Sequence, residues 1–218
     1  KINTTFYRLP RAAAVARWVE ETPDDFVFSV KASRYLTHVK RLRDVAEHLP
    51  ILLERLDPLV RSPKLGPLLW QLPPTFRCDL DRLAGALEQL PRGLRHAFEF
   101  RHPSWFREEL YTLLREHEVA LVIGDRPQVH EFQTLELTAD FTFVRFHAGT
   151  RGARGNYAPT ELDAWAKRLG GWAREVDVFA YFNNDWEGFA VRNARGLRER
   201  LGLPTPVPAP AADPGRRR

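Results

Sequence analysis

The sequence predicts an α/β protein of the TIM-like (β/α)8 barrel class that lacks its first βα unit, with seven strands visible. Strand-like and helix-like segments alternate seven times along the 218 residues, which is typical of a parallel sheet with right-handed crossovers. Several strands are apolar on both faces, as a sheet covered on both sides requires. The chain opens directly into KINTTFY without a preceding turn and contains no methionine, so we expect its N-terminus to be trimmed.

A doubly wound open sheet is the alternative architecture. No G-x-G-x-x-G follows a first strand, so the barrel is favoured. We expect one barrel domain over residues 1–203. The Pro/Ala/Arg tail, residues 204–218, cannot bury a core and is predicted to be disordered. A barrel without its first unit would expose unpaired strand edges, so we expect the isolated chain to be unstable or prone to aggregate.

The seven strands are predicted from short runs rich in β-branched, aromatic and other apolar residues. The first run, NTTFY, alternates enough to be the end of a strand, and two prolines stop the third run, LGPLLWQLPP. In chain order, the strands are expected at residues 3–7, 26–33, 65–74, 96–102, 120–125, 141–149 and 177–185.

The helices are predicted from apolar residues at helical spacing. Pro50 and Pro58 are expected to break the second helical stretch, and Asp79 is a suitable N-cap for the third. In chain order, the helical stretches are expected at residues 11–21, 41–61, 79–90, 106–118, 160–176 and 188–201.

Composition limits the classes of protein that the chain can belong to. Its hydrophobic content of 44% is ample for a core, and no run reaches the roughly 18–20 apolar residues of a membrane helix. The single cysteine, Cys78, excludes an internal disulfide framework and favours a cytoplasmic protein. The net charge is +5. Arg216, Arg217 and Arg218 against Asp213 account for +2, which leaves +3 for the body, so basicity alone argues weakly for a nucleic-acid partner.

The segment FEFRHPSW (98–105) places charged side chains in an otherwise apolar strand. Alternate residues of a strand share a face, so Glu99 and Arg101 point one way while Phe98 and Phe100 point the other. Barrel enzymes carry their chemistry at the carboxyl ends of the strands. We therefore expect Glu99 and Arg101 to face the lumen near its mouth and the two phenylalanines to pack beneath the outer helices. A buried structural ion pair is the alternative.

The same alternation brings polar groups from the other strands to the same end of the barrel. Asp125 ends LVIGD, and Arg145 shares a face with His147. Below the mouth, Val27 and Ala97 are expected to fill the interior together with Phe143 and Phe179. The candidate catalytic residues are Glu99, Lys31 and His147. The candidate ligand-binding residues are Asn3, Gln71, Arg101, Arg145, Tyr181 and Asn183.

Six motifs together resemble the domain of unknown function 72 (YecE-like) family over residues 2–201: INTTFYRLP, FVFSVKASRYLTH, LWQLPPTF, FEFRHPSW, FVRFHAG and YFNNDWEGFAVRNA. The resemblance implies a TIM-like barrel but names no reaction. Members usually begin with a Gly-Thr-Ser-Gly-Trp strand and a Trp-containing loop that this chain lacks, and Lys1 stands where they usually have glutamate. The resemblance also implies that recurrent motif positions include Asn3, Lys31, Gln71, Glu99, Arg101, His102, Arg145, His147, Asn183 and Asn184.

Three functions remain open from the sequence. The leading one is an enzyme or degenerate enzyme that binds a small anionic or polyhydroxylated ligand, with Lys31, Arg101 and Arg145 on the anion and Glu99 as acid or base. The second is metal-dependent hydrolase or isomerase chemistry, with Glu99 and His147 joined by Asp125 or by a residue of the missing strand. The third is nucleic-acid binding through Arg151, Arg154 and the tail. No cofactor or oligomeric state is predicted.

Overall fold

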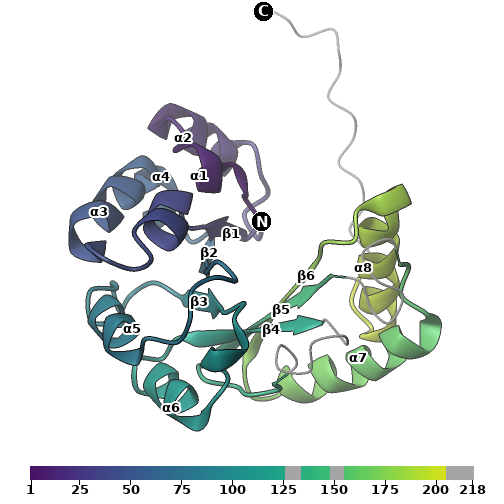
Figure 1. The fold of residues 1–218 in the computed structure, drawn as a ribbon. Helices are drawn as coiled ribbons and strands as arrows, with labels where there is room; N and C mark the ends of the chain where they lie inside the picture. The colour runs from purple at the N-terminus through teal and green to yellow at the C-terminus, as the bar shows by residue number, and fades with distance from the viewer. Residues whose placement is uncertain (126–133, 148–154, 205–218) are drawn as a thin grey trace, which may run out of the picture.

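A computed structural model describes residues 1–125, 134–147 and 155–204. It shows an α/β fold built on a curled parallel sheet whose strands are hydrogen-bonded in the order of the sequence, from β1 to β6 (Figure 1). Every neighbouring pair is parallel. The strands are β1 Phe28–Lys31, β2 Leu65–Gln71, β3 His96–Glu99, β4 Ala120–Asp125, β5 Phe141–Phe146 and β6 Asp177–Phe182.

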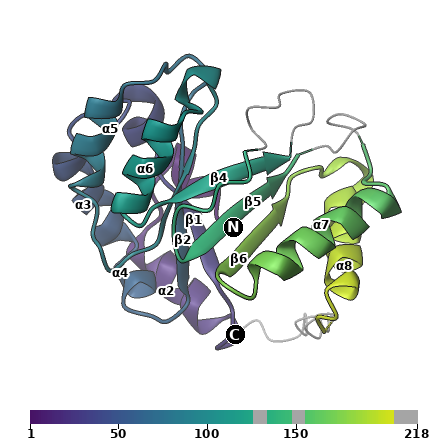
Figure 2. The ribbon, with the colours of Figure 1, turned by 90° about the horizontal axis from the view of Figure 1, so that it is seen from below.

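The helices lie outside the curve of the sheet, with α5 and α6 beside β3 and β4 and with α7 and α8 beside β6 (Figures 1 and 2). The side chain of Asp79 accepts a hydrogen bond from Arg82 N at 3.1 Å, so the predicted N-cap of α5 is confirmed. The α-helices are α1 Thr4–Tyr7, α2 Ala12–Glu20, α3 Val45–Arg55, α4 Asp57–Val60, α5 Leu80–Leu87, α6 Glu108–Glu116, α7 Pro159–Trp172 and α8 Phe189–Arg200. A π-helix, η1 Tyr35–Val39, and two 3-10 helices, η2 Pro103–Trp105 and η5 Trp186–Gly188, lie after strands.

The two faces of the sheet bury different side chains. Phe98 and Phe100 are fully buried in the core beneath the outer helices, with the ring of Phe98 stacked on Trp70. This confirms the alternation predicted for FEFRHPSW. A separate apolar cluster lines the inner face, and it includes the expected Ala97, Phe143 and Phe179. The middle of the concave face is therefore packed with apolar side chains.

Contacts across the concave face show that the sheet curls back toward its first strands. A Cβ built on Gly66 of β2 would lie 3.6 Å from the ring of Phe179 on β6. Arg95, just before β3, forms an ion pair with Asp177 at the start of β6 at 2.7 Å. Strands at opposite ends of the sheet order therefore face each other across a shared interior.

Four details differ from the sequence-based expectation. Residues 4–7 form the short helix α1, and the predicted first strand is reduced to one parallel bridge between Ile2 and Val30. The sheet of the described residues accordingly has six strands rather than seven. Val27 precedes β1 and is 45% exposed, so it does not fill the interior. Pro50 lies inside α3 without ending it.

Within the described ranges, no helix is both long and apolar enough to cross a lipid bilayer. The predicted tail, apart from Pro204, lies outside the described residues.

Candidate functional site

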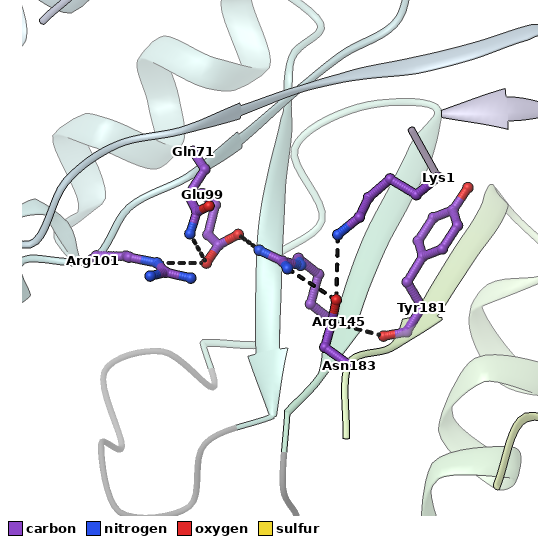
Figure 3. A network of polar contacts seen from close by, with 7 residues as sticks. All are labelled: Lys1, Gln71, Glu99, Arg101, Arg145, Tyr181 and Asn183. Carbon is purple, nitrogen blue, oxygen red and sulfur yellow. Dashed lines mark hydrogen bonds and ion pairs between the residues drawn. The ribbon is translucent and has the colours of Figure 1, made fainter. Parts of the chain in front are cut away.

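The candidate site is centred on Glu99, the last residue of β3, whose carboxylate is buried with only 6% of the residue exposed. Arg101 Nε donates a hydrogen bond to Glu99 Oε1 at 2.9 Å, and Gln71 Nε2 donates to the same oxygen at 3.4 Å. Arg145 Nη1 donates to the other oxygen, Glu99 Oε2. Both carboxylate oxygens are therefore occupied by donors from three neighbouring segments (Figure 3).

Arg145 connects this carboxylate to the last strand of the sheet. The guanidinium of Arg145, itself only 7% exposed, donates through Nη2 to Asn183 Oδ1 at 3.0 Å. Lys1 Nζ donates to the same oxygen at 3.3 Å and lies 6.0 Å from the ring centroid of Tyr181. Asn183 Nδ2 in turn donates to the backbone oxygen of Tyr181 at 3.3 Å. One continuous polar network thus spans β2, β3, β5 and the end of β6 (Figure 3).

The two arginines determine the charge state of Glu99. Burial alone would raise the pKa of this carboxyl group, but Arg145 and Arg101 outweigh burial and hold the pKa well below its usual range. His147 acts in the same direction and therefore lies near the carboxylate. Glu99 is ionised at neutral pH, which makes it a poor general acid or base there and an effective anchor for the arginine side chains.

The pKa values of two lysines of the site are also lowered, which for an amine favours the neutral form. Burial lowers the pKa of Lys1 to about 7, with a further contribution from Arg145. Burial also lowers the pKa of Lys31 to about 8; Glu99 opposes this shift, and Arg145 and Arg101 add to it. Both amines therefore titrate near neutral pH rather than near their ordinary value of 10.5.

Positive charge exceeds negative charge among these mutually interacting groups. The charged neighbours that shift the pKa of Lys1 are Arg145, Glu99, Lys31 and Arg101. One carboxylate thus faces two arginines and two lysines. Such an excess of cationic donors around a buried centre favours an anionic ligand, since carboxylate and phosphate oxygens complement guanidinium groups.

The structure brings together most of the residues predicted from strand alternation. The contact network contains Gln71, Glu99, Arg101, Arg145, Tyr181 and Asn183. Lys31 and His147 interact with the network electrostatically, because Glu99 raises the pKa of Lys31 and His147 lowers the pKa of Glu99. Asn3 is the exception, because it is exposed and precedes α1 instead of ending a strand.

Lys1 was missing from the predicted site. It lies on the polar network through its contact with Asn183, although the sequence-based selection began at Asn3. Strand alternation does not identify it, because Asn3, which would share a face with Lys1 in an extended segment, has helical backbone angles and lies off the network.

The metal-binding alternative is not supported for the residues first proposed. No group of three His, Cys, Asp or Glu side chains in the described ranges is arranged to hold a metal ion. Asp125 pairs in register with Phe146, whereas Arg145 pairs with Gly124. Because Phe146 belongs to the outer core, alternation places Asp125 on the face opposite Arg145. Glu99, His147 and Asp125 therefore do not form a metal site.

His102 has a structural role in the turn that follows β3. Its ring nitrogen Nδ1 accepts a hydrogen bond from Ser104 N at 3.1 Å and lies 2.8 Å from Ser104 Oγ. This contact caps the short helix η2 after β3. Arg151, Arg154 and the terminal arginines of the nucleic-acid hypothesis lie outside the described residues, so that hypothesis stays a prediction.

These features define an α/β protein with a curled parallel sheet and a cationic site at the carboxyl ends of its strands. The chain belongs to the family described as "Protein of unknown function DUF72", which matches residues 1–216. It is 28% identical to the UPF0759 protein YunF of Bacillus subtilis (strain 168), over 93% of this chain and 83% of that protein. It is 38% identical to the UPF0759 protein YecE of Escherichia coli (strain K12), over 59% of this chain and 48% of that protein.

Solved structures of the same family have the same fold. A DUF72 family protein from Thermotoga maritima MSB8 superposes with a TM-score of 0.79 at 29% identity, covering 91% of this chain and 82% of that chain. A DUF72 family protein from Enterococcus faecalis V583 gives a TM-score of 0.82 at 24% identity, with coverage of 94% and 84%. None of these names states a reaction or a ligand.

Proposed function

We propose that this chain is an enzyme or degenerate enzyme of the TIM-like barrel class that binds a small anionic ligand at the carboxyl ends of its strands. The sequential order of six parallel strands and the approach of Phe179 on β6 to Gly66 on β2 support the barrel. The observation that carries the ligand class is the buried Glu99–Arg145–Asn183 network with its excess of cations. Polyhydroxylated anions fit as well, because Gln71 and Asn183 supply amide groups beside the arginines.

The roles of the side chains follow from their charge states. Arg101 and Arg145 bind the anion, and Glu99 acts as a positioning residue that holds both guanidinium groups in place. Acid–base work falls to groups that titrate near neutral pH, which among the described residues include Lys1 and Lys31. This differs from the role first expected for Glu99.

The test is the thermal stability of the chain in the presence of sugar phosphates, inorganic phosphate and dicarboxylates, with uncharged sugars as controls. A ligand at 100 times its Kd stabilises by about 2.7 kcal/mol, which raises the Tm of a domain of this size by roughly 5–10 °C. Arg145→Gln should remove most of the shift. Arg174→Gln, which changes an exposed arginine on the turn after α7, should not.

Arg101→Gln provides a second variant if Arg145→Gln does not fold. The proposal fails if anions shift the Tm no more than uncharged sugars do. It also fails if the substitutions at Arg101 and Arg174 reduce the response equally.

A further inference from the structure

Lys31 is the last residue of β1, and hydrogen bonds hold its backbone in place. Its backbone N–H donates to Ile2 O at 3.0 Å, and its carbonyl oxygen accepts from Thr5 Oγ1 at 2.6 Å. Thr5 is completely buried, whereas Lys31 keeps intermediate exposure. The side chain therefore starts from a fixed backbone position and remains accessible to a small molecule.

The amine of Lys31 rests on an aromatic ring. Its Nζ lies 3.6 Å from the ring centroid of Phe6, and the ring of His38 also meets Phe6, edge-on, with 5.0 Å between the ring centroids. Burial lowers the pKa of His38 to about 4, and the nearby charge of Lys31 contributes to this shift, so His38 is neutral at neutral pH. This face-on contact is a cation–π interaction that favours the charged amine, whereas burial and the neighbouring Arg145 and Arg101 disfavour it.

Two other lysines have polar contacts of the usual kind. Lys64 Nζ donates to Val19 O at 2.7 Å and to Thr22 O at 2.8 Å, and Lys40, which has intermediate exposure, forms an ion pair with Asp44 at 2.8 Å. Within the described ranges, the side chain of Lys31 makes no such hydrogen bond; its charged neighbours are Glu99, Arg145 and Arg101. A desolvated lysine beside other cations is the arrangement that activates an amine as a nucleophile.

The lowered pKa of about 8 strengthens this argument. At pH 7, about a tenth of such an amine is neutral, compared with less than a thousandth at the ordinary pKa near 10.4. Neutral amine is the form that attacks a carbonyl carbon.

We infer that Lys31 forms an imine with a small carbonyl compound that carries an anionic group, such as a 2-oxo acid whose carboxylate is bound by Arg145 and Arg101. This inference rests on the proposed function, since the arginines must hold the anion. The Nζ lone pair attacks the carbonyl carbon, and the C=O π electrons move to oxygen, which takes up a proton. The resulting carbinolamine then loses water. Overall, Nζ gives up two hydrogens, the carbonyl oxygen leaves with them as H2O, and a C=N bond replaces the C=O bond.

Trapping with glyoxylate and sodium borohydride tests the inference, because borohydride delivers hydride to the imine carbon and makes the adduct permanent. The full chain is treated at pH 7 and the modified lysine is located by peptide mass spectrometry. We expect near-stoichiometric labelling of Lys31 and at least tenfold less at Lys40 and Lys64. Lys31→Arg keeps the charge but cannot form an imine, so it should abolish this label, whereas Lys40→Arg should leave it unchanged.

Inorganic phosphate separates this inference from the proposed function. If phosphate stabilises the chain and Lys31 is labelled in a phosphate-sensitive manner, both hold. If phosphate still stabilises both the wild type and Lys31→Arg but labelling follows surface exposure, or is confined to Lys1, the imine is overturned and anion binding stands. If phosphate neither stabilises the chain nor competes with the label, the proposed function fails as well.

Discussion

At the amino ends of the strands one arginine bridges two carboxylates, whereas at the carboxyl ends one carboxylate bridges two arginines. Arg95 contacts Asp177 at 2.7 Å and Asp140 at 3.4 Å, and all three side chains are at least 37% exposed. Glu99 and Arg145, at the other end, are 8% exposed as side chains. The same pair of chemical groups therefore occurs in water at one end and in the protein interior at the other.

This difference separates a structural contact from the proposed binding site. The exposed cluster around Arg95 has its charges screened by solvent and contributes little, while the ring of Phe179 beneath the guanidinium helps to orient it. The buried cluster carries more cations than its single carboxylate can neutralise, which is unfavourable for folding. This excess of buried cations is the feature from which we propose an anionic ligand.

Removing the central carboxylate should produce the largest effect. Glu99→Ala leaves Arg145 and Arg101 next to Lys31 without a counter-charge, so we expect the free energy of unfolding to fall by about 3–5 kcal/mol. Urea denaturation followed by circular dichroism measures it. A loss below about 1 kcal/mol would mean that the cluster is as well solvated as the one around Arg95.

Acid should act selectively on the carboxyl end. The folded pKa of Glu99 lies below its ordinary value of 4.5 because Arg145 and Arg101 outweigh burial. A depressed carboxyl pKa stabilises the fold above the unfolded pKa, and the stabilisation is lost as the pH falls below about 4.5 toward the folded pKa. Glu99→Gln should therefore show a shallower acid limb than the wild type in unfolding curves between pH 6 and pH 3. Parallel limbs in the two proteins would contradict the buried ion pair.

How much of this site the sequence predicted depends on which property placed each residue. Alternation along a strand is local, so FEFRHPSW was sufficient to separate Glu99 and Arg101 from Phe98 and Phe100. The prediction for Asp125 was wrong because its position at the end of a strand places it near the mouth of the barrel but does not say which face of the sheet its side chain is on. Asn3 was misplaced because NTTFY has the composition of a strand, whereas its residues form α1 and only Ile2 bridges to Val30.

The charge states were not predictable from the sequence. The lowered pKa of Lys31 arises from burial and from Arg145 and Arg101, which are 70 or more positions away in the sequence. Only the curl of the sheet brings them together. For the same reason, Glu99 was expected to act as an acid or base, and its arginine neighbours make it an anchor.

Alkaline pH should act on the lysines of the carboxyl end. The pKa of Lys31 is about 8 in the folded state and near its ordinary 10.5 when unfolded, so between these values the unfolded chain binds more protons and stability rises with pH. Lys31→Met should remove part of this rise. The effect is on the order of 1 kcal/mol, since one pKa unit corresponds to about 1.4 kcal/mol and solvent screens a half-exposed amine. An equal slope in Lys31→Met would show that the amine is fully solvated.

The smallest effect is expected at the amino ends of the strands. Asp177→Asn removes the shorter of the two contacts of Arg95, but Asp140 remains, and all of these groups reach water. We expect the free energy of unfolding to change by about 0–1 kcal/mol, and the change should shrink further in 1 M salt, where the Debye length is about 3 Å. Phosphate binding should be unaffected. A loss of phosphate binding in Asp177→Asn would remove the distinction between the two ends, because it would show that the exposed cluster also sets the geometry of the cationic one.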